Sequence, residues 1–159
     1  MTEATTLYEL RGVGRRYLRG SAEVAALADL DLDVAAGEFL SIEGPSGSGK
    51  STLLQLLGAL DTPTTGTIAF DGRILGAASD AELTAVRSRD IGFVFQQFNL
   101  IPTVTALDNV ELAMVPMSVS RRDRRQRARA LLEQVGLGHR VDHLPSRLSG
   151  GEQQRVAIA

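Results

Sequence analysis

The sequence contains no cysteine in its 159 residues. This absence excludes disulfide bonds, metal sites built on thiolates and cysteine nucleophiles. Long apolar runs are missing too, because none approaches the roughly 20 residues that a membrane-spanning helix needs. Met1–Ala4 does not resemble the beginning of a signal peptide. We therefore expect a cytoplasmic protein, or one bound peripherally to the cytoplasmic face of the cell membrane.

The charged residues are balanced, with a formal net charge of −2. Bulk charge therefore gives no indication of a nucleic-acid partner. A run of arginines at 121–129 leaves a nucleic-acid patch open as an alternative. This run lacks the interleaved aromatic residues that stack on bases, so a solvated helix face is the favoured interpretation. We expect no nucleic-acid partner.

The sequence contains one lysine, Lys50. It lies near the end of a glycine-rich stretch, Gly44–Ser51. This stretch fits the pattern G-x-x-x-x-G-K-[S/T], the Walker A phosphate-binding loop. The preceding residues 38–43 are predicted to form a buried strand and the following residues 52–57 a helix that ends near Gly58. Glycines let the backbone turn its N–H groups inward, and the helix start adds partial positive charge. A Gly/Ser turn that happens to precede a lysine is the alternative.

The loop pattern assigns roles to single residues. We predict that Lys50 contacts the β- and γ-phosphates of a nucleotide, since a compact ammonium fits a tight cradle better than a guanidinium does. The Ser51 hydroxyl is predicted to ligate Mg²⁺. The complete set of predicted phosphate-binding residues is Gly44, Pro45, Ser46, Gly47, Ser48, Gly49, Lys50, Ser51 and Thr52.

Residue patterns predict strands in the first half of the chain and helices in the second. Strands are expected at 7–10, 30–34, 67–70 and 91–95, and a basic loop at 11–20. Helices are expected at 79–87, at 105–114 with Thr105 as its cap, and at 121–135 with the arginines in its first half. Ser79 with Glu82, and Ser149 with Glu152, have the spacing of capping boxes. The expected fold is α/β: a nucleotide-binding core with a mixed sheet at 1–102 and a helical subdomain at 103–159.

Three motifs together resemble the ATP-binding cassette (ABC) ATPases: the loop Gly44–Ser51, the segment Phe93–Gln96, and the signature Leu148–Gln153. Residues 92–102 are more specifically similar to the lipoprotein-releasing and macrolide-exporting branch. The resemblance covers nearly the whole chain. It implies a P-loop NTPase core with a mixed sheet, a helical subdomain, ATP and Mg²⁺ as cofactors, and a membrane permease that ATP hydrolysis drives in export or lipoprotein release.

The resemblance also implies roles outside the phosphate loop. Tyr17 corresponds to the aromatic residue that stacks on adenine, with an ordinary loop tyrosine as the alternative. Gln96 corresponds to the glutamine that contacts Mg²⁺ and the attacking water, and its neighbour Gln97 is the competing candidate. Lys50 and Gln96 are thus the expected catalytic residues, and Ser51 and Gln96 the expected metal ligands. The apolar side chains that follow, Phe98, Leu100 and Ile101, either meet the membrane partner or are buried under the helical subdomain.

In the family, the signature motif completes the ATP site of a second copy. A capped helix start alone explains the spacing of Ser149 and Glu152. The resemblance implies more: this helix start faces the γ-phosphate of ATP bound to the other subunit, in a two-fold dimer that ATP holds together. The implied nucleotide contacts are Ser149, Gly150, Gly151, Glu152 and Gln153.

The family pattern continues past Ala159 with the Walker B strand, a catalytic glutamate and a switch histidine. His139 and His143 precede the signature and do not correspond to that histidine. We therefore expect a chain that lacks the C-terminal part of the core, binds nucleotide weakly and hydrolyses it negligibly. Two alternatives stay open: a non-transport ABC ATPase that acts on nucleic acid or ribosomes, and an inert or binding-only fragment.

Overall fold

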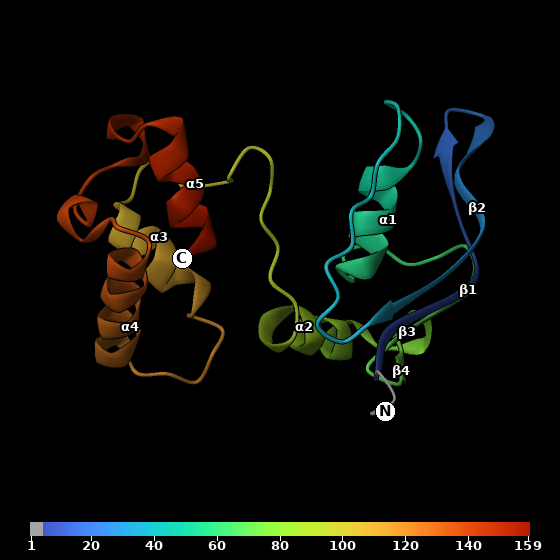
Figure 1. Cartoon of the computed structure of the whole chain (residues 1–159), viewed down its shortest axis with the longest axis horizontal. Coiled ribbons are helices and arrows are strands. Elements are labelled where there is room, and N and C mark those ends of the chain that lie inside the picture. The colour runs from blue at the N-terminus through green and yellow to red at the C-terminus, as the bar shows by residue number, and fades with distance from the viewer. Residues whose placement is uncertain (1–4) are drawn as a thin grey trace. The chain divides into compact units, whose positions relative to one another are not determined.

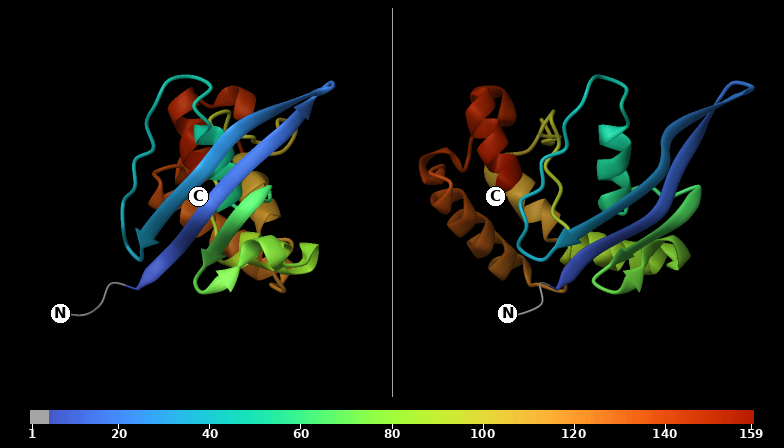
Figure 2. Two further views of the ribbon diagram at one scale, coloured as in Figure 1. Left: turned by 90° about the vertical axis from the view of Figure 1, so that its right-hand side faces the viewer. Right: turned by 45° about the vertical axis from the view of Figure 1, so that its right-hand side comes forward.

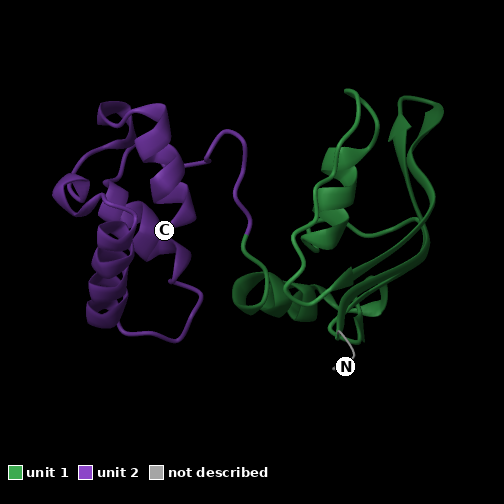
Figure 3. Cartoon of the chain, viewed as in Figure 1, with its two compact units in different colours: residues 1–92 green, residues 93–159 purple. Residues whose placement is uncertain are grey.

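The computed structural model describes residues 5–159, so Met1–Ala4, on which the prediction about a signal peptide rests, lie outside the described residues. The chain divides into two compact units, residues 1–92 and 93–159 (Figure 3). The expected division between a core and a helical subdomain at residues 102 and 103 stays a prediction. Each unit has a hydrophobic core of its own.

The first unit is built on a sheet of four antiparallel strands in the order β2-β1-β3-β4 (Figure 1). The strands are β1 (Thr6–Arg19), β2 (Ala22–Ala35), β3 (Thr65–Phe70) and β4 (Arg73–Ile74). Figure 2 shows β1 and β2 as one long hairpin. The predicted strands 7–10, 30–34 and 67–70 are confirmed as parts of β1, β2 and β3.

The prediction of a loop at 11–20 is wrong, because β1 continues to Arg19. Its residues pair with β2 and, up to Gly14, also with β3, so the ladder satisfies their backbone groups. Register shifts around Gly12 and Gly14 absorb the glycines that suggested a loop. The basic side chains pair across the hairpin, Arg16 with Glu23 at 3.5 Å for example.

The two predicted buried strands at 38–43 and 91–95 are also wrong, since neither segment belongs to the sheet in the described part of the chain. A strand exists only where its N–H and C=O groups find a ladder partner, and residues 5–159 supply none for these segments. Phe39 is consequently 95% exposed. Only the antiparallel part of the expected mixed sheet is therefore formed.

Helix α1 (Lys50–Leu57) follows the glycine loop and has Gly58 as its C-cap, so it ends where the sequence predicts. The 3-10 turn η1 (Leu75–Ala77) leads to α2 (Asp80–Arg89), which begins with the predicted capping box of Ser79 and Glu82. Both helices contribute buried side chains to one core with the sheet. Its members include Leu10, Ile68, Leu53, Leu56 and Leu83.

The second unit is helical, as predicted. It contains α3 (Ala106–Ala113), α4 (Arg121–Gln134), α5 (Gly150–Ile158) and the 3-10 turns η2 (Gly138–Arg140) and η3 (Pro145–Arg147). Its core contains the fully buried Leu107, Leu132 and Leu137. Within residues 5–159, no helix has the length and apolar character to cross a membrane.

Candidate nucleotide-binding site

The glycine loop takes a conformation that depends on its glycines. Gly47 and Gly49 have φ angles of 84° and 90°, in the left-handed region that other residues rarely adopt. A Cβ on Gly49 would collide with the carbonyl oxygen of Ala26 in β2. Gly49 therefore serves both the turn and the close approach of the loop to the β1–β2 hairpin.

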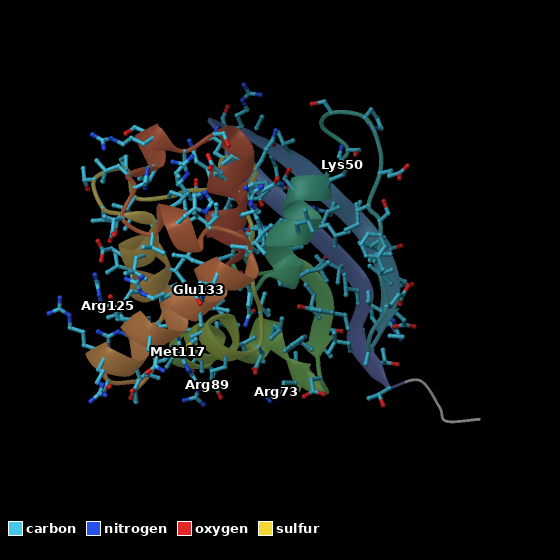
Figure 4. The ribbon with its side chains drawn as sticks, turned by 60° about the vertical axis from the view of Figure 1, so that its left-hand side comes forward. Lys50, Arg73, Arg89, Met117, Arg125 and Glu133 are labelled. Atoms are coloured by element: carbon cyan, nitrogen blue, oxygen red, sulfur yellow. The ribbon has the colours of Figure 1, made fainter. Side chains whose placement is uncertain are left out.

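Lys50 is the first residue of α1, and its ammonium lies in the curl of the loop (Figure 4). Its Nζ donates to the carbonyl oxygens of Gly44 at 2.8 Å and Pro45 at 2.7 Å, and lies 3.4 Å from the Ser48 hydroxyl. Among the described residues, no side chain caps the first turn of α1, and no acidic residue lies in that turn. The first N–H groups of α1 thus stay available to an anion beside a fixed positive charge.

An open hollow of about 490 Å³ lies beside this loop. Its lining residues are Ala26, Ser46, Gly47, Gly49, Lys50, Ser51 and Thr52. This volume falls within the range of roughly 300–1,000 Å³ that is typical of small-molecule sites. The structure thus brings most of the predicted phosphate-binding residues to one surface and adds Ala26, which the sequence did not indicate.

Ser51 and the hollow fit a magnesium ion that arrives with phosphates. Ser51 lies in the first turn of α1 and lines the hollow. Within residues 5–159, no cluster of three acidic, histidine or cysteine side chains could hold a metal alone. Mg²⁺ keeps several waters and is commonly held through few protein oxygens together with substrate phosphates, and the Ser51 hydroxyl is an oxygen donor of the kind that could serve such an ion.

Tyr17 lies in β1 instead of a loop, and its side chain is held in place. Its hydroxyl donates to Asp61 at 2.8 Å, and the Arg15 guanidinium lies 4.7 Å from its ring centroid. Tyr17 pairs with Val24 of β2, two residues before Ala26, which lines the hollow. The predicted base-stacking residue therefore belongs to the hairpin that borders the phosphate loop.

Gln96 and Gln97 occupy the two central positions of one turn in the second unit. The Phe98 amide closes this turn with a 3.0 Å bond to the Phe95 carbonyl. Both glutamines are exposed. The turn thus presents both side-chain amides to solvent. Its geometry does not favour Gln96 over Gln97 as the residue that contacts the metal.

The loop that follows the glutamines is tied to α3. The Asn109 side chain accepts from the Ile101 amide at 2.7 Å and donates to the Ile101 carbonyl at 3.2 Å. Leu100 packs against the core of the second unit, so the burial alternative holds for this residue. Ile101 is 44% exposed and Phe98 half-buried. Of the three apolar candidates for a partner surface, Ile101 is the most accessible.

Ser149, Gly150 and Gly151 form an exposed start of α5. The predicted capping box is confirmed: the Glu152 amide donates to the Ser149 hydroxyl at 3.3 Å, and the Ser149 amide donates to the Glu152 carboxylate at 2.8 Å. This backbone bond, with help from the Ser149 hydroxyl, holds the pKa of Glu152 below its usual value. Arg140 lies 3.3 Å from the same carboxylate.

The remaining signature residue, Gln153, points back into its own unit. Its amide donates to the carbonyl oxygens of Pro145 at 3.0 Å and Leu148 at 3.1 Å. It therefore fixes the approach of the chain to α5. Any contact of Gln153 with a nucleotide would have to compete with these bonds.

The arginine run of α4 is partly engaged inside its own unit. Arg125 lies 3.2 Å from both Asp108 and Glu111. Arg124 donates to the Val119 carbonyl at 2.9 Å. These contacts agree with the interpretation of α4 as a helix with a solvated charged face.

Several residues that shape these sites are not indicated by any sequence motif: Ala26, Arg15, Asp61, Asn109 and Arg140. The position of Ala26 follows from an irregular strand register, which no local pattern reveals. The same holds for Arg15 and Asp61, which lie far apart in the sequence. Asn109 lies four residues after Thr105, and this helical spacing is the only sequence signal for the bonds that it makes to the preceding loop.

Comparison with known proteins decides the family. The ABC transporter family matches residues 27–159. The chain belongs to this family. It is 48% identical over 153 residues to the uncharacterized ABC transporter ATP-binding protein YknY of Bacillus subtilis, covering 96% of the chain and 66% of that relative. It is likewise 48% identical over 153 residues to the macrolide export ATP-binding/permease protein MacB 1/2 of Paracoccus denitrificans, covering 96% of the chain but 23% of that larger protein.

Solved cassettes of the family have the same fold. The dimeric post-hydrolysis structure of the ATP-binding cassette MJ0796, bound to ADP and Pi, matches with a TM-score of 0.87 at 46% identity. The match covers 96% of this chain and 67% of that one. The expected P-loop NTPase fold is thereby confirmed. The chain spans about two thirds of the length of YknY and about a quarter of the length of MacB 1/2.

Proposed function

We propose that this chain binds ATP with Mg²⁺ at the hollow beside the glycine loop, as the ATP-binding subunit of an ABC transporter. The observation that carries the proposal is the Lys50 ammonium, which lies in the curl of the loop at the uncapped start of α1. The carbonyl oxygens of Gly44 and Pro45 hold it there. A cation and free N–H groups that converge on one hollow favour a polyphosphate ligand.

Each predicted residue has a chemical task in this proposal. Lys50 contacts the β- and γ-phosphates, and the N–H groups of residues 46, 47 and 49–52 donate to the other phosphate oxygens. Mg²⁺ neutralises charge that develops on the phosphates. Ser51 would hold this ion on the first unit, and Gln96 would supply an amide oxygen for it and orient water. We propose ATP hydrolysis as the activity of a full-length cassette of this family; the chain spans about two thirds or less of the length of the relatives named above.

We further propose that ATP joins two copies of the chain through the exposed start of α5. The Ser149 hydroxyl and the amides of Gly150 and Gly151 would meet the γ-phosphate held by the other copy. The exposure of these residues supports the proposal, as does the dimeric state of the MJ0796 cassette. The identical partner makes the assembly two-fold symmetric.

The partner of the dimer is inferred to be a permease. MacB-type relatives are named ATP-binding/permease proteins. We infer that this chain works at the cytoplasmic face of a membrane, where loss of the γ-phosphate separates the two copies and moves the permease in export or lipoprotein release. The Phe98–Ile101 loop is the proposed contact surface.

The single lysine gives a direct test of the site. An amine-reactive reagent can modify only Lys50 and the N-terminal amine of this chain. We expect MgATP to protect Lys50 from acetylation, measured by mass spectrometry of proteolytic peptides. The N-terminal amine serves as the internal control and should react at an unchanged rate. Equal labelling of Lys50 with and without saturating MgATP would contradict the proposal.

We also propose that residues 1–159 alone turn ATP over negligibly. In the described residues, the segment 38–43 that leads into the loop has no ladder partner to fix it. Phosphate release from this chain should therefore stay at the level of a Lys50→Ala control. Turnover like that of a complete family member would overturn this part of the proposal.

A further inference from the structure

We propose that Asp61 and Arg15 are positioning residues that fix the Tyr17 ring for a nucleobase and so make the site prefer ATP to a bare polyphosphate. This inference rests on the proposed binding of ATP. It assigns to the pair a role in base recognition, separate from the capture of phosphate by Lys50.

The three side chains form a closed set of contacts. Arg15 meets the Asp61 carboxylate with two nitrogens, Nε at 2.9 Å from Oδ2 and Nη2 at 2.7 Å from Oδ1. The Tyr17 hydroxyl donates to the same Oδ2 at 2.8 Å. A bidentate arginine–carboxylate pair fixes direction as well as distance. Both charged side chains are about four-fifths buried, with relative exposures of 23% and 20%, so water screens the pair less than a surface pair.

Arg15 also restricts the ring itself. Its guanidinium carbon lies 4.7 Å from the Tyr17 ring centroid, within the range of a cation–π contact. One ring face is thus covered by a cation, and the base would stack on the opposite face. Stacking on aromatic side chains is favourable for any base, and a ring that is already held loses less conformational freedom on binding.

Asp61 connects this set to the phosphate helix. The amides of Leu60 and Asp61 both donate to the Gln55 carbonyl of α1, at 2.9 and 3.3 Å. The same α1 begins with Lys50. The end of α1 therefore determines where the carboxylate stands, and the carboxylate determines where Tyr17 stands. In this way a single helix sets the distance between the base and the phosphates.

The experiment compares two ligands on the 159-residue chain: MgATP and magnesium tripolyphosphate, which lacks the nucleoside. We expect Asp61→Asn to weaken ATP binding about tenfold and to leave tripolyphosphate binding within about twofold, because only the base contact loses its support. Tyr17→Ala should have the same selective effect. In the Tyr17→Ala background, Asp61→Asn should have no further effect on the ratio of the two affinities.

Asp71→Asn is the matched control, since Asp71 lies in the β3–β4 turn of the same unit and its closest ion pair is at 4.0 Å. It should leave both affinities unchanged. Tyr17→Phe keeps the ring and loses only the hydrogen bond to Asp61. We therefore expect its affinity for MgATP to lie between that of the wild type and that of Tyr17→Ala. Its fold is less at risk than that of Asp61→Asn.

The outcomes separate the two proposals. If the wild-type chain binds neither ligand, the proposed function fails and this inference fails with it. If the wild type binds both ligands and Asp61→Asn weakens both equally, or changes neither, Asp61 has no role in base recognition and the inference alone is overturned. Preserved tripolyphosphate binding in the variant proves that its phosphate loop is intact.

Discussion

The two glycine-rich helix starts of this chain, at α1 and at α5, look alike in sequence and differ in structure. The start of α5 is satisfied from within, because Ser149 and Glu152 cap each other's backbone amides. The start of α1 has Gly49 at its N-cap, no side-chain cap among the described residues, and an ammonium in place of a carboxylate. The first is stable without a ligand, whereas the second leaves N–H groups for a ligand to satisfy.

This difference explains how the two sites could divide one task. A helix start that already holds a carboxylate attracts a phosphate weakly, so α5 suits a role in which another copy presents the phosphate. The uncapped α1, with Lys50 beside it, can capture a polyphosphate alone. Four substitutions or conditions test the comparison, from the largest expected effect to the smallest.

Gly49→Ala should have the largest effect. The new Cβ would meet the Ala26 carbonyl and would also force a left-handed φ on alanine. We expect a loss of about 3 kcal/mol of stability in the first unit, from strain and overpacking together. Thermal unfolding of the variant provides the measurement. Gly47→Ala is the control, since Gly47 shares the left-handed φ but has open space around it, and it should lose about 1 kcal/mol.

Ser149→Ala should weaken only the second unit. The variant loses the cap of α5, and substitutions of this kind cost about 1 kcal/mol. Hydrogen exchange should rise in peptides from α5 and stay unchanged in peptides from α1. Exposed Ser146, in η3, offers a matched serine whose replacement by alanine should leave α5 protection as it is. Equal exchange in the two variants would show that the cap does not hold this helix.

Gly150→Ala should leave the fold intact or stabilise it slightly. Among the described residues, no atom lies within 4 Å of the added Cβ, and alanine favours a helix by up to about 1 kcal/mol over glycine. If this glycine serves a ligand from a second copy, the variant should keep its stability and lose ATP-dependent dimerisation in light scattering. A dimer that forms as well as the wild type would remove Gly150 from the proposed interface.

Acid should loosen α5 with little effect on the start of α1. Hydrogen bonds from Ser149 lower the folded-state pKa of Glu152, so its contribution to stability is complete above the ordinary glutamate pKa of about 4.3 and is lost as pH falls through the lower folded value. Amide chemical shifts of the α5 first turn should report this titration. The Glu152→Gln variant should lose this pH dependence. The amide chemical shifts of Lys50 and Ser51 should change little with pH in either protein.

Local chemistry was predictable where a short pattern determines a conformation. The helix caps at Ser79, Thr105 and Ser149, the end of α1 at Gly58 and the fold class all follow from neighbouring residues. The long β1 was missed because its glycines and arginines suggest a loop, and only pairing with β2 and β3 makes it a strand. The strands expected at 38–43 and 91–95 failed for the opposite reason, since their apolar residues have no ladder partner within residues 5–159.

The candidate site divides in the same way. The sequence pattern specified the phosphate loop, because its backbone and Lys50 are local in the chain. The support of Tyr17 came from Arg15 and Asp61, which are far apart in the sequence and meet only after the sheet and α1 have packed. Long-range pairs of this kind leave no periodic signal in a single sequence.

The irregular pairing of β2 has a consequence for how the hairpin can change length. Arg15 pairs with Leu27 and Arg16 with Ala25, so Ala26 has no opposite residue, and its carbonyl is the one that Gly49 approaches. Insertions at the exposed tip, Gly20–Ser21, would leave this carbonyl in place. A deletion at Ala26 would straighten the strand and remove the surface on which the loop rests. Natural length variation should therefore collect at the tip and avoid position 26.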